Sequence, residues 1–113
     1  MKAISLKQPY ANWIAEGKKT LETRTWATKH RGNLLIVSSR LPALEPAGYA
    51  VAVVEVIACR PMTEQDEQAA CVSLYPKAWV WELAHIHRIK PIPLKGSLGI
   101  YSVPIEISDL EYI

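Results

Sequence analysis

The chain has 113 residues, of which 50% are hydrophobic, and a formal net charge of +2, so we expect one domain, spanning residues 1–113, around a single core. No apolar run approaches the roughly 18 residues that a membrane-spanning helix needs, and the first residues lack the apolar segment of a signal peptide. These features favour a cytoplasmic protein with no membrane association.

Positive charge is concentrated at the start of the chain. Residues 1–31 contain seven basic and two acidic side chains, a net charge of +5, whereas the remainder carries a net charge of −3. A basic surface on a nearly neutral protein suggests an anionic partner at one site, such as nucleic acid or a phosphorylated small molecule. A charge run that serves solubility alone is the alternative interpretation.

The predicted elements are mainly strands. Runs of alternating or β-branched residues predict the strands. A first helix is delimited by a proline at its first position and a glycine after its last turn. A second helix is indicated by Thr63 as the N-cap of an acidic first turn. In chain order we expect a strand over 2–6, a helix from Pro9 to Gly17, strands over 20–26 and 33–39, a loop over 40–48, a strand over 49–60, a helix over 63–71, a strand over 79–86, an extended passage at 91–93 and a strand over 98–105.

Two of these strands carry further expectations. The continuous apolar run within 33–39 suggests burial on both faces, and residues 49–60 form the longest strand candidate. Six short strands with two short helices favour a mainly β (α+β) fold, a small closed or nearly closed barrel of about six strands with the helices at its flanks.

Residues 17–26 combine cations, one carboxylate and an indole within a single predicted strand and its approach. Alternate side chains of a strand share a face, so one side would present Thr20, Glu22, Arg24 and Trp26. This pattern indicates a binding wall, and a solvated strand with an ordinary ion pair is the alternative. Lys19 and Glu22 can converge only if Lys19 precedes the regular part of the strand.

Cysteine and histidine give no metal signature. Cys59 and Cys71 stand alone, with no Cys-x-x-Cys pair. His85 and His87 could share a strand face, but two histidines on a half-exposed strand are more simply surface residues. We therefore expect neither a metal nor another cofactor.

Several segments together resemble a known family. The runs Ile4-Ser5-Leu6-Lys7-Gln8-Pro9-Tyr10-Ala11, Gly17 to Trp26 and Arg31-Gly32 are similar to the ASCH domain, named for activating signal cointegrator homology. The later segments Leu34 to Ser39 and Ile92 to Gly96 look like further family elements, so the resemblance extends almost end to end. It implies a PUA-like barrel of the kind associated with RNA, with a cleft between the barrel and the first helix.

The resemblance also implies a ligand and a set of site residues. RNA or a modified nucleoside is the expected ligand, DNA is an alternative, and a protein partner is a further one. Phosphates would meet cations, bases would stack on aromatic rings, and a polar side chain would read a base edge. The cations are Lys18, Lys19 and Arg24, the aromatic residues are Tyr10, Trp26 and Trp81, and the edge-reading residues are Gln8 or Glu22.

Catalysis by this cleft is an open alternative. One bacterial branch of similar domains acts as an acetylcytidine amidohydrolase with a lysine, a threonine three positions later and a distant glutamate. Lys19 matches that lysine, but Glu22 occupies the position of the threonine. RNA cleavage is associated with other ASCH proteins, and Lys19 and Glu22 would be its catalytic residues. The alternatives to a binding domain are thus a small hydrolase acting on RNA or a nucleoside, and a protein-interaction module.

Overall fold

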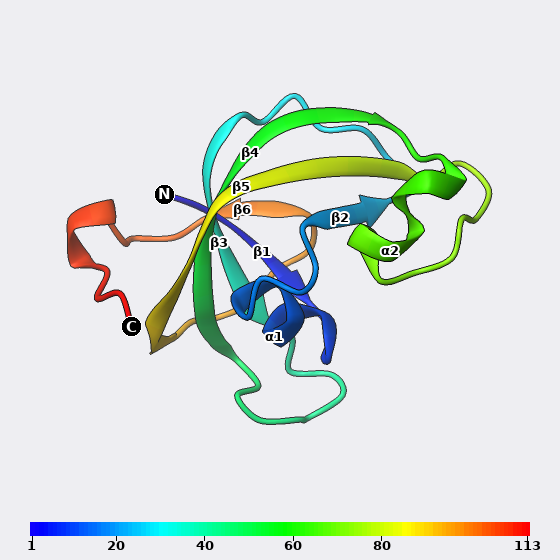
Figure 1. Cartoon of the computed structure of the whole chain (residues 1–113). Coiled ribbons are helices and arrows are strands. Elements are labelled where there is room, and N and C mark those ends of the chain that lie inside the picture. The colour runs from blue at the N-terminus through cyan, green and yellow to red at the C-terminus, as the bar shows by residue number, and fades with distance from the viewer.

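The computed structural model describes all residues 1–113 and shows one curled six-stranded sheet with short helices at its margins (Figure 1). The strands are β1 (Lys2–Leu6), β2 (Leu21–Arg24), β3 (Gly32–Ser38), β4 (Tyr49–Pro61), β5 (Trp79–Pro93) and β6 (Ile100–Ser102). The helices are α1 (Tyr10–Ala15) and α2 (Glu67–Ala70), with 3-10 helices η1 (Glu64–Asp66) and η2 (Ile107–Asp109). None of the helices has the length and apolar character needed to cross a membrane.

The strand order is β2-β5-β4-β3-β1-β6. β1 and β3 pair in parallel, and every other neighbouring pair is antiparallel. The predicted mainly β, barrel-like fold of six strands is confirmed, but the sheet is a half-barrel because its two edge strands, β2 and β6, do not pair with each other. The molecule therefore keeps an open side between these edges.

Apolar side chains fill both faces of the sheet. Leu34 and Ile36 of β3 belong to one buried cluster, which α1 joins through Ala11 and Ile14. The intervening Leu35 and Val37 belong to a second cluster on the opposite face. The predicted burial of this strand on both faces is confirmed, because successive side chains of a strand point to opposite sides of the sheet.

Three predicted strands differ from those observed. β2 ends at Arg24, so Trp26 lies beyond it, and β6 has only three residues. β5 has 15 residues against 13 for β4, so the prediction that residues 49–60 form the longest strand is wrong. β5 absorbs both the predicted strand 79–86 and the extended passage 91–93. Register shifts against β4 and a positive φ of 49° at His85 let so long a strand bend with the sheet.

The short helix α2 is fixed beneath β2 by polar contacts. Asp66 accepts hydrogen bonds from the backbone N–H of Thr63 and from both terminal guanidinium nitrogens of Arg60, each at 2.8 Å. These contacts, the Arg60 hydrogen bonds above all, hold the pKa of Asp66 well below its ordinary value. The backbone N–H of Thr20 donates to the carbonyl of Ala69 at 2.9 Å. The end of α2 is thereby held against the residues that lead into β2.

Candidate nucleic-acid interface

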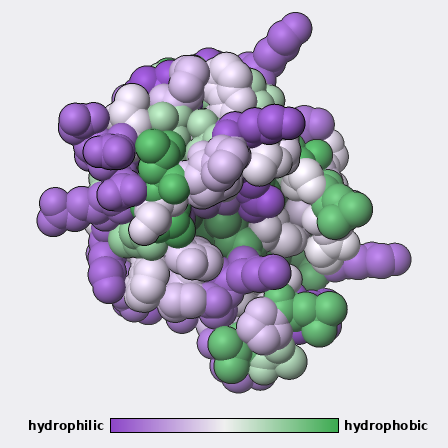
Figure 2. All heavy atoms as spheres, turned by 90° about the vertical axis from the view of Figure 1, so that its right-hand side faces the viewer, coloured by the Kyte–Doolittle hydropathy of each residue, from purple (hydrophilic) through white to green (hydrophobic).

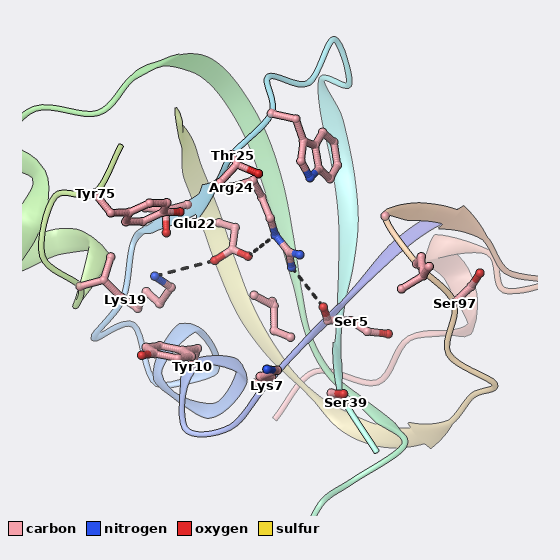
Figure 3. Close-up of a pocket in the computed structure, with 16 residues that line it drawn as sticks. Ser5, Lys7, Tyr10, Lys19, Glu22, Arg24, Thr25, Ser39, Tyr75 and Ser97 are labelled. Atoms are coloured by element: carbon pink, nitrogen blue, oxygen red, sulfur yellow. Dashed lines mark hydrogen bonds and ion pairs between the residues drawn. The ribbon is translucent and has the colours of Figure 1, made fainter. Parts of the chain in front are cut away.

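A cleft of about 590 Å³ occupies the open side of the half-barrel (Figure 3). One wall is the edge strand β2 with the residues that follow it, and the opposite wall is the segment 97–99, which precedes β6. The end of β1, the start of α1, Lys19 before β2, Ser39 after β3 and a segment after α2 complete the lining. The cleft is thus a direct consequence of the incomplete closure of the sheet.

Glu22 is the central charged group of the cleft. It is 5% exposed, and its carboxylate accepts a hydrogen bond from Arg24 Nε at 2.9 Å, while its other oxygen lies 3.8 Å from Lys19 Nζ. Arg24 also donates from Nη2 to the backbone carbonyl of Ser5 at 3.1 Å. The carboxylate therefore orders two cations, and Arg24 connects β2 to β1 across the cleft (Figure 3).

Lys19 reaches this carboxylate because it lies before β2 rather than within it. Gly17, at a φ of +80°, ends the turn after α1, and the backbone N–H groups of Lys18 and Lys19 both donate to the carbonyl of Trp13. The Lys19 side chain then points inward, with only 1% of the residue exposed, and its ammonium donates to the carbonyl of Ala70. The geometric condition for Lys19 and Glu22 to converge is met.

Burial shifts the ionisation of this pair. The pKa of Lys19 is lowered because desolvation disfavours its ammonium, an effect that Glu22 partly offsets. The pKa of Glu22 is raised by its own desolvation, which Arg24 and Lys19 partly oppose. Burial and the partner charges thus act on each pKa in opposite directions, and perturbed pairs of this kind in a cleft are typical of functional sites.

Trp26 and Trp81, both predicted from the sequence to stack a base, differ in their exposure. Trp26 is 39% exposed and lines the cleft, whereas Trp81 is fully buried in the core. The rings meet edge to face with centroids 4.9 Å apart, and Trp81 Nε1 donates to the carbonyl of Trp26 at 3.4 Å. The prediction of Trp81 as a base-stacking residue is therefore corrected: Trp81 supports Trp26 from beneath and offers no face to a ligand.

Gln8 and Lys18 also lie outside the cleft lining. The buried amide of Gln8 donates to Ser38 Oγ at 2.9 Å and to Asn12 Oδ1 at 3.1 Å, so it ties the start of α1 to β3. The ammonium of Lys18 lies 4.1 Å from the centre of the Trp13 ring, on the outside of the helix. Of the eight predicted site residues, the structure gathers five in the cleft: Tyr10, Lys19, Glu22, Arg24 and Trp26.

The cleft contains further residues that the sequence did not single out. Tyr75, from the segment after α2, and Lys7, which follows β1, both line it, and Figure 3 shows Tyr75 and Tyr10 on opposite sides of the Lys19–Glu22 pair. Lys7 lies within the run that resembles ASCH domains, so a signal for it existed. Tyr75 had none, because the approach of its segment to β2 depends on the tertiary placement of α2.

Potential metal ligands do not converge in this chain. No group of three or more histidine, cysteine, aspartate or glutamate side chains comes together. His85 Nδ1 instead lies 2.8 Å from Glu55 Oε1, and the ring of His87 stacks on that of Tyr112. Both histidines lie on β5, and their partners come from β4 and from the C-terminal segment.

Comparison with known proteins agrees with this architecture. The ASCH domain profile matches residues 4–93, most of the chain. The crystal structure of ASCH from Zymomonas mobilis has a TM-score of 0.73 at 16% identity, covering 96% of this chain and 89% of that one. A variant of that protein with a tyrosine-to-phenylalanine substitution has a TM-score of 0.62 at 19% identity, covering 82% of this chain and 75% of that one. A variant with a serine-to-alanine substitution has a TM-score of 0.68 at 16% identity, covering 90% of this chain and 87% of that one. No curated protein matches the chain.

The fold and the match define the class of protein: a small PUA-like domain, a fold generally associated with RNA binding. The chain belongs to the ASCH family.

Proposed function

We propose that this ASCH domain binds single-stranded RNA, with one base stacked against Trp26 and the adjoining backbone held by Arg24 and Lys7. The observation that carries the proposal is an aromatic ring supported from beneath, beside cations, in an open cleft. Proteins that bind single strands combine a basic groove with aromatic stacking in this manner. A modified nucleoside within such a strand fits the same arrangement.

The hydrogen-bond donors that remain unused in the site suit a phosphodiester. Arg24 uses Nε and Nη2 within the protein, which leaves Nη1 free for a phosphate oxygen. Lys7 is exposed and forms no ion pair. Lys19, in contrast, is buried against Ala70 and Glu22. It contributes to affinity through the positive electrostatic potential that it adds to the cleft and by holding Glu22 in position.

Binding of RNA by this site should weaken as salt rises. With two or three phosphates contacted, log K should fall against log salt concentration with a slope of about −1.4 to −2.1, so that a fourfold rise in salt lowers the affinity by about 7- to 18-fold. Fluorescence anisotropy of a labelled single-stranded RNA of about 12 nucleotides, titrated with protein at about 50 and 200 mM salt, measures this slope. Absence of binding at the lower salt would contradict the proposal and direct attention to nucleosides or proteins.

A second candidate function is RNA cleavage, which the placement of Glu22 and Lys19 in the cleft favours. In that case Glu22 would accept the proton of a ribose 2′-hydroxyl as its oxygen attacks the phosphorus, and Arg24 would stabilise the phosphorane. Lys19 would donate a proton to the 5′-oxygen as the P–O5′ bond breaks. Under this hypothesis Glu22→Gln should abolish cleavage of a labelled RNA on a gel and leave its binding largely intact, at a temperature where the variant remains folded. If the wild-type protein binds the RNA without cleaving it, the cleft is a binding site alone.

A further inference from the structure

Beside the cleft lies a second hollow, of about 390 Å³, whose lining has a different chemistry. We call it the serine hollow, because Ser5, Ser38, Ser39 and Ser97 line it together with Arg40 and Lys95. Ser5, Ser39 and Ser97 also line the cleft, so the two depressions share a wall. In Figure 3, Ser39 and Ser97 lie on the side of the cleft away from Tyr75, which is the side that leads to the serine hollow.

The charge of the serine hollow is entirely positive. None of its ten lining residues is acidic, and neither Arg40 nor Lys95 forms an ion pair with any carboxylate. In the cleft, by comparison, Glu22 pairs with Lys19 and Arg24, and Lys7 alone is unpaired. Two unpaired cations beside the accessible hydroxyl groups of Ser39 and Ser97 suit an anion that carries several acceptor oxygens, because ammonium, guanidinium and hydroxyl groups can all donate to it.

The guanidinium of Arg40 lies in the serine hollow against a glycine, Gly48. The guanidinium of Arg40 packs on the backbone of Gly48, where a Cβ atom would lie 3.0 Å from Arg40 Cζ. Gly48 also has a φ of +81°, which residues with a side chain rarely adopt. The absence of a side chain at Gly48 thus leaves the space over the turn before β4 in which the guanidinium of Arg40 lies.

We infer that the serine hollow holds a backbone phosphate of the RNA strand whose neighbouring nucleotide occupies the cleft. This inference rests on the proposed function, and it extends the ligand from a single nucleoside to an oligonucleotide. The strand leaves Trp26, crosses the shared serines and places a phosphodiester between Arg40 and Lys95. Figure 2 shows the face of the molecule that lies on the right in Figure 1, where hydrophobic atoms form several separate groups among projecting hydrophilic side chains.

The test compares three variants in the anisotropy assay with the same short RNA. Arg40→Gln/Lys95→Gln should lower the affinity about tenfold at low salt and reduce the magnitude of the salt slope by about 1. The matched control Arg88→Gln/Lys90→Gln removes the same charge from β5, at positions that line neither depression, and should change the affinity less than twofold. Arg24→Gln/Trp26→Ala tests the cleft itself.

The outcomes separate this inference from the proposed function. If the cleft variant loses binding and Arg40→Gln/Lys95→Gln keeps the affinity and slope of the wild type, the cleft remains an RNA site and the phosphate site is refuted. A loss no larger than that of the β5 control refutes it as well, since the effect would then be one of net charge. Failure of the wild-type protein to bind RNA would refute both the proposed RNA-binding function and the phosphate site. Inorganic phosphate at matched ionic strength should not displace the RNA; displacement would identify the serine hollow as a site for free phosphate instead.

Discussion

Arg24→Gln/Trp26→Ala should weaken the binding of single-stranded RNA by about 100-fold. Loss of one base-stacking ring costs roughly 1–3 kcal/mol, and loss of one charged phosphate contact adds to it. Both side chains line the cleft and are partly exposed, but Arg24 pairs with the buried Glu22 and Trp26 packs on Trp81, so circular dichroism must show that the variant is folded at the temperature of the assay. Anisotropy titrations at constant salt give the ratio of affinities.

A control with the same kinds of side chain excludes a general effect. Tyr112→Ala/Arg88→Gln removes an aromatic ring that is 55% exposed and an exposed arginine, and neither residue lines the cleft. This variant should bind within about twofold of the wild type, because removal of one distant surface charge has little effect on phosphate contacts. Equal losses in the two double variants would show that RNA contacts the protein without using the cleft.

Glu22→Gln should lower the free energy of unfolding by about 3 kcal/mol at neutral pH, because it leaves the buried ammonium of Lys19 without a charged partner. The amide can still accept the hydrogen bond from Arg24, so the effect reports mainly on Lys19. Urea unfolding followed by circular dichroism measures the difference. Glu55→Gln, which alters an exposed pair with His85, is the matched control and should cost less than about 0.5 kcal/mol.

The deficit of Glu22→Gln should also depend on pH. Without the carboxylate, the pKa of Lys19 falls further below its ordinary value of 10.5, so between these values the unfolded chain binds more protons than the folded one. Stability therefore rises with pH in that range, and the deficit should shrink as pH is raised from about 7 to 10. Replacement of both residues, as Lys19→Met/Glu22→Gln, should cost less than the sum of the single variants. A deficit that is constant across this pH range would contradict an unpaired ammonium as its cause.

Local sequence patterns were sufficient for most of the fold. The alternation in β1, the continuous apolar run of β3 and the turn at Gly17 each predicted an element close to the observed one. The length of β5 was not predictable in this way, because two prolines argue against a strand interior. They are tolerated at its far end, where β4 is its only strand partner and β2 does not extend.

The site residues that lie close together in the sequence could be predicted from it. Lys19, Glu22 and Arg24 are close in sequence, so their convergence required only the position at which β2 begins. Trp81 was misjudged because a tryptophan two residues from another on a strand looks equally suited to a core or a surface, and only the pairing of β5 between β2 and β4 buries it. Tyr75, Arg40 and Lys95 come from loops whose approach depends on the whole fold.

The most direct test of the proposed RNA site is to follow the four indole N–H signals in a ¹H–¹⁵N correlation spectrum during titration with a short single-stranded RNA. The signal of Trp26 should move most, and that of Trp81 should move less, through its hydrogen bond to the Trp26 carbonyl. The signal of Trp13, which lies outside the cleft lining, should stay in place. RNA binding that leaves Trp26 unchanged while other signals shift would contradict the assignment of the cleft as the nucleic-acid site.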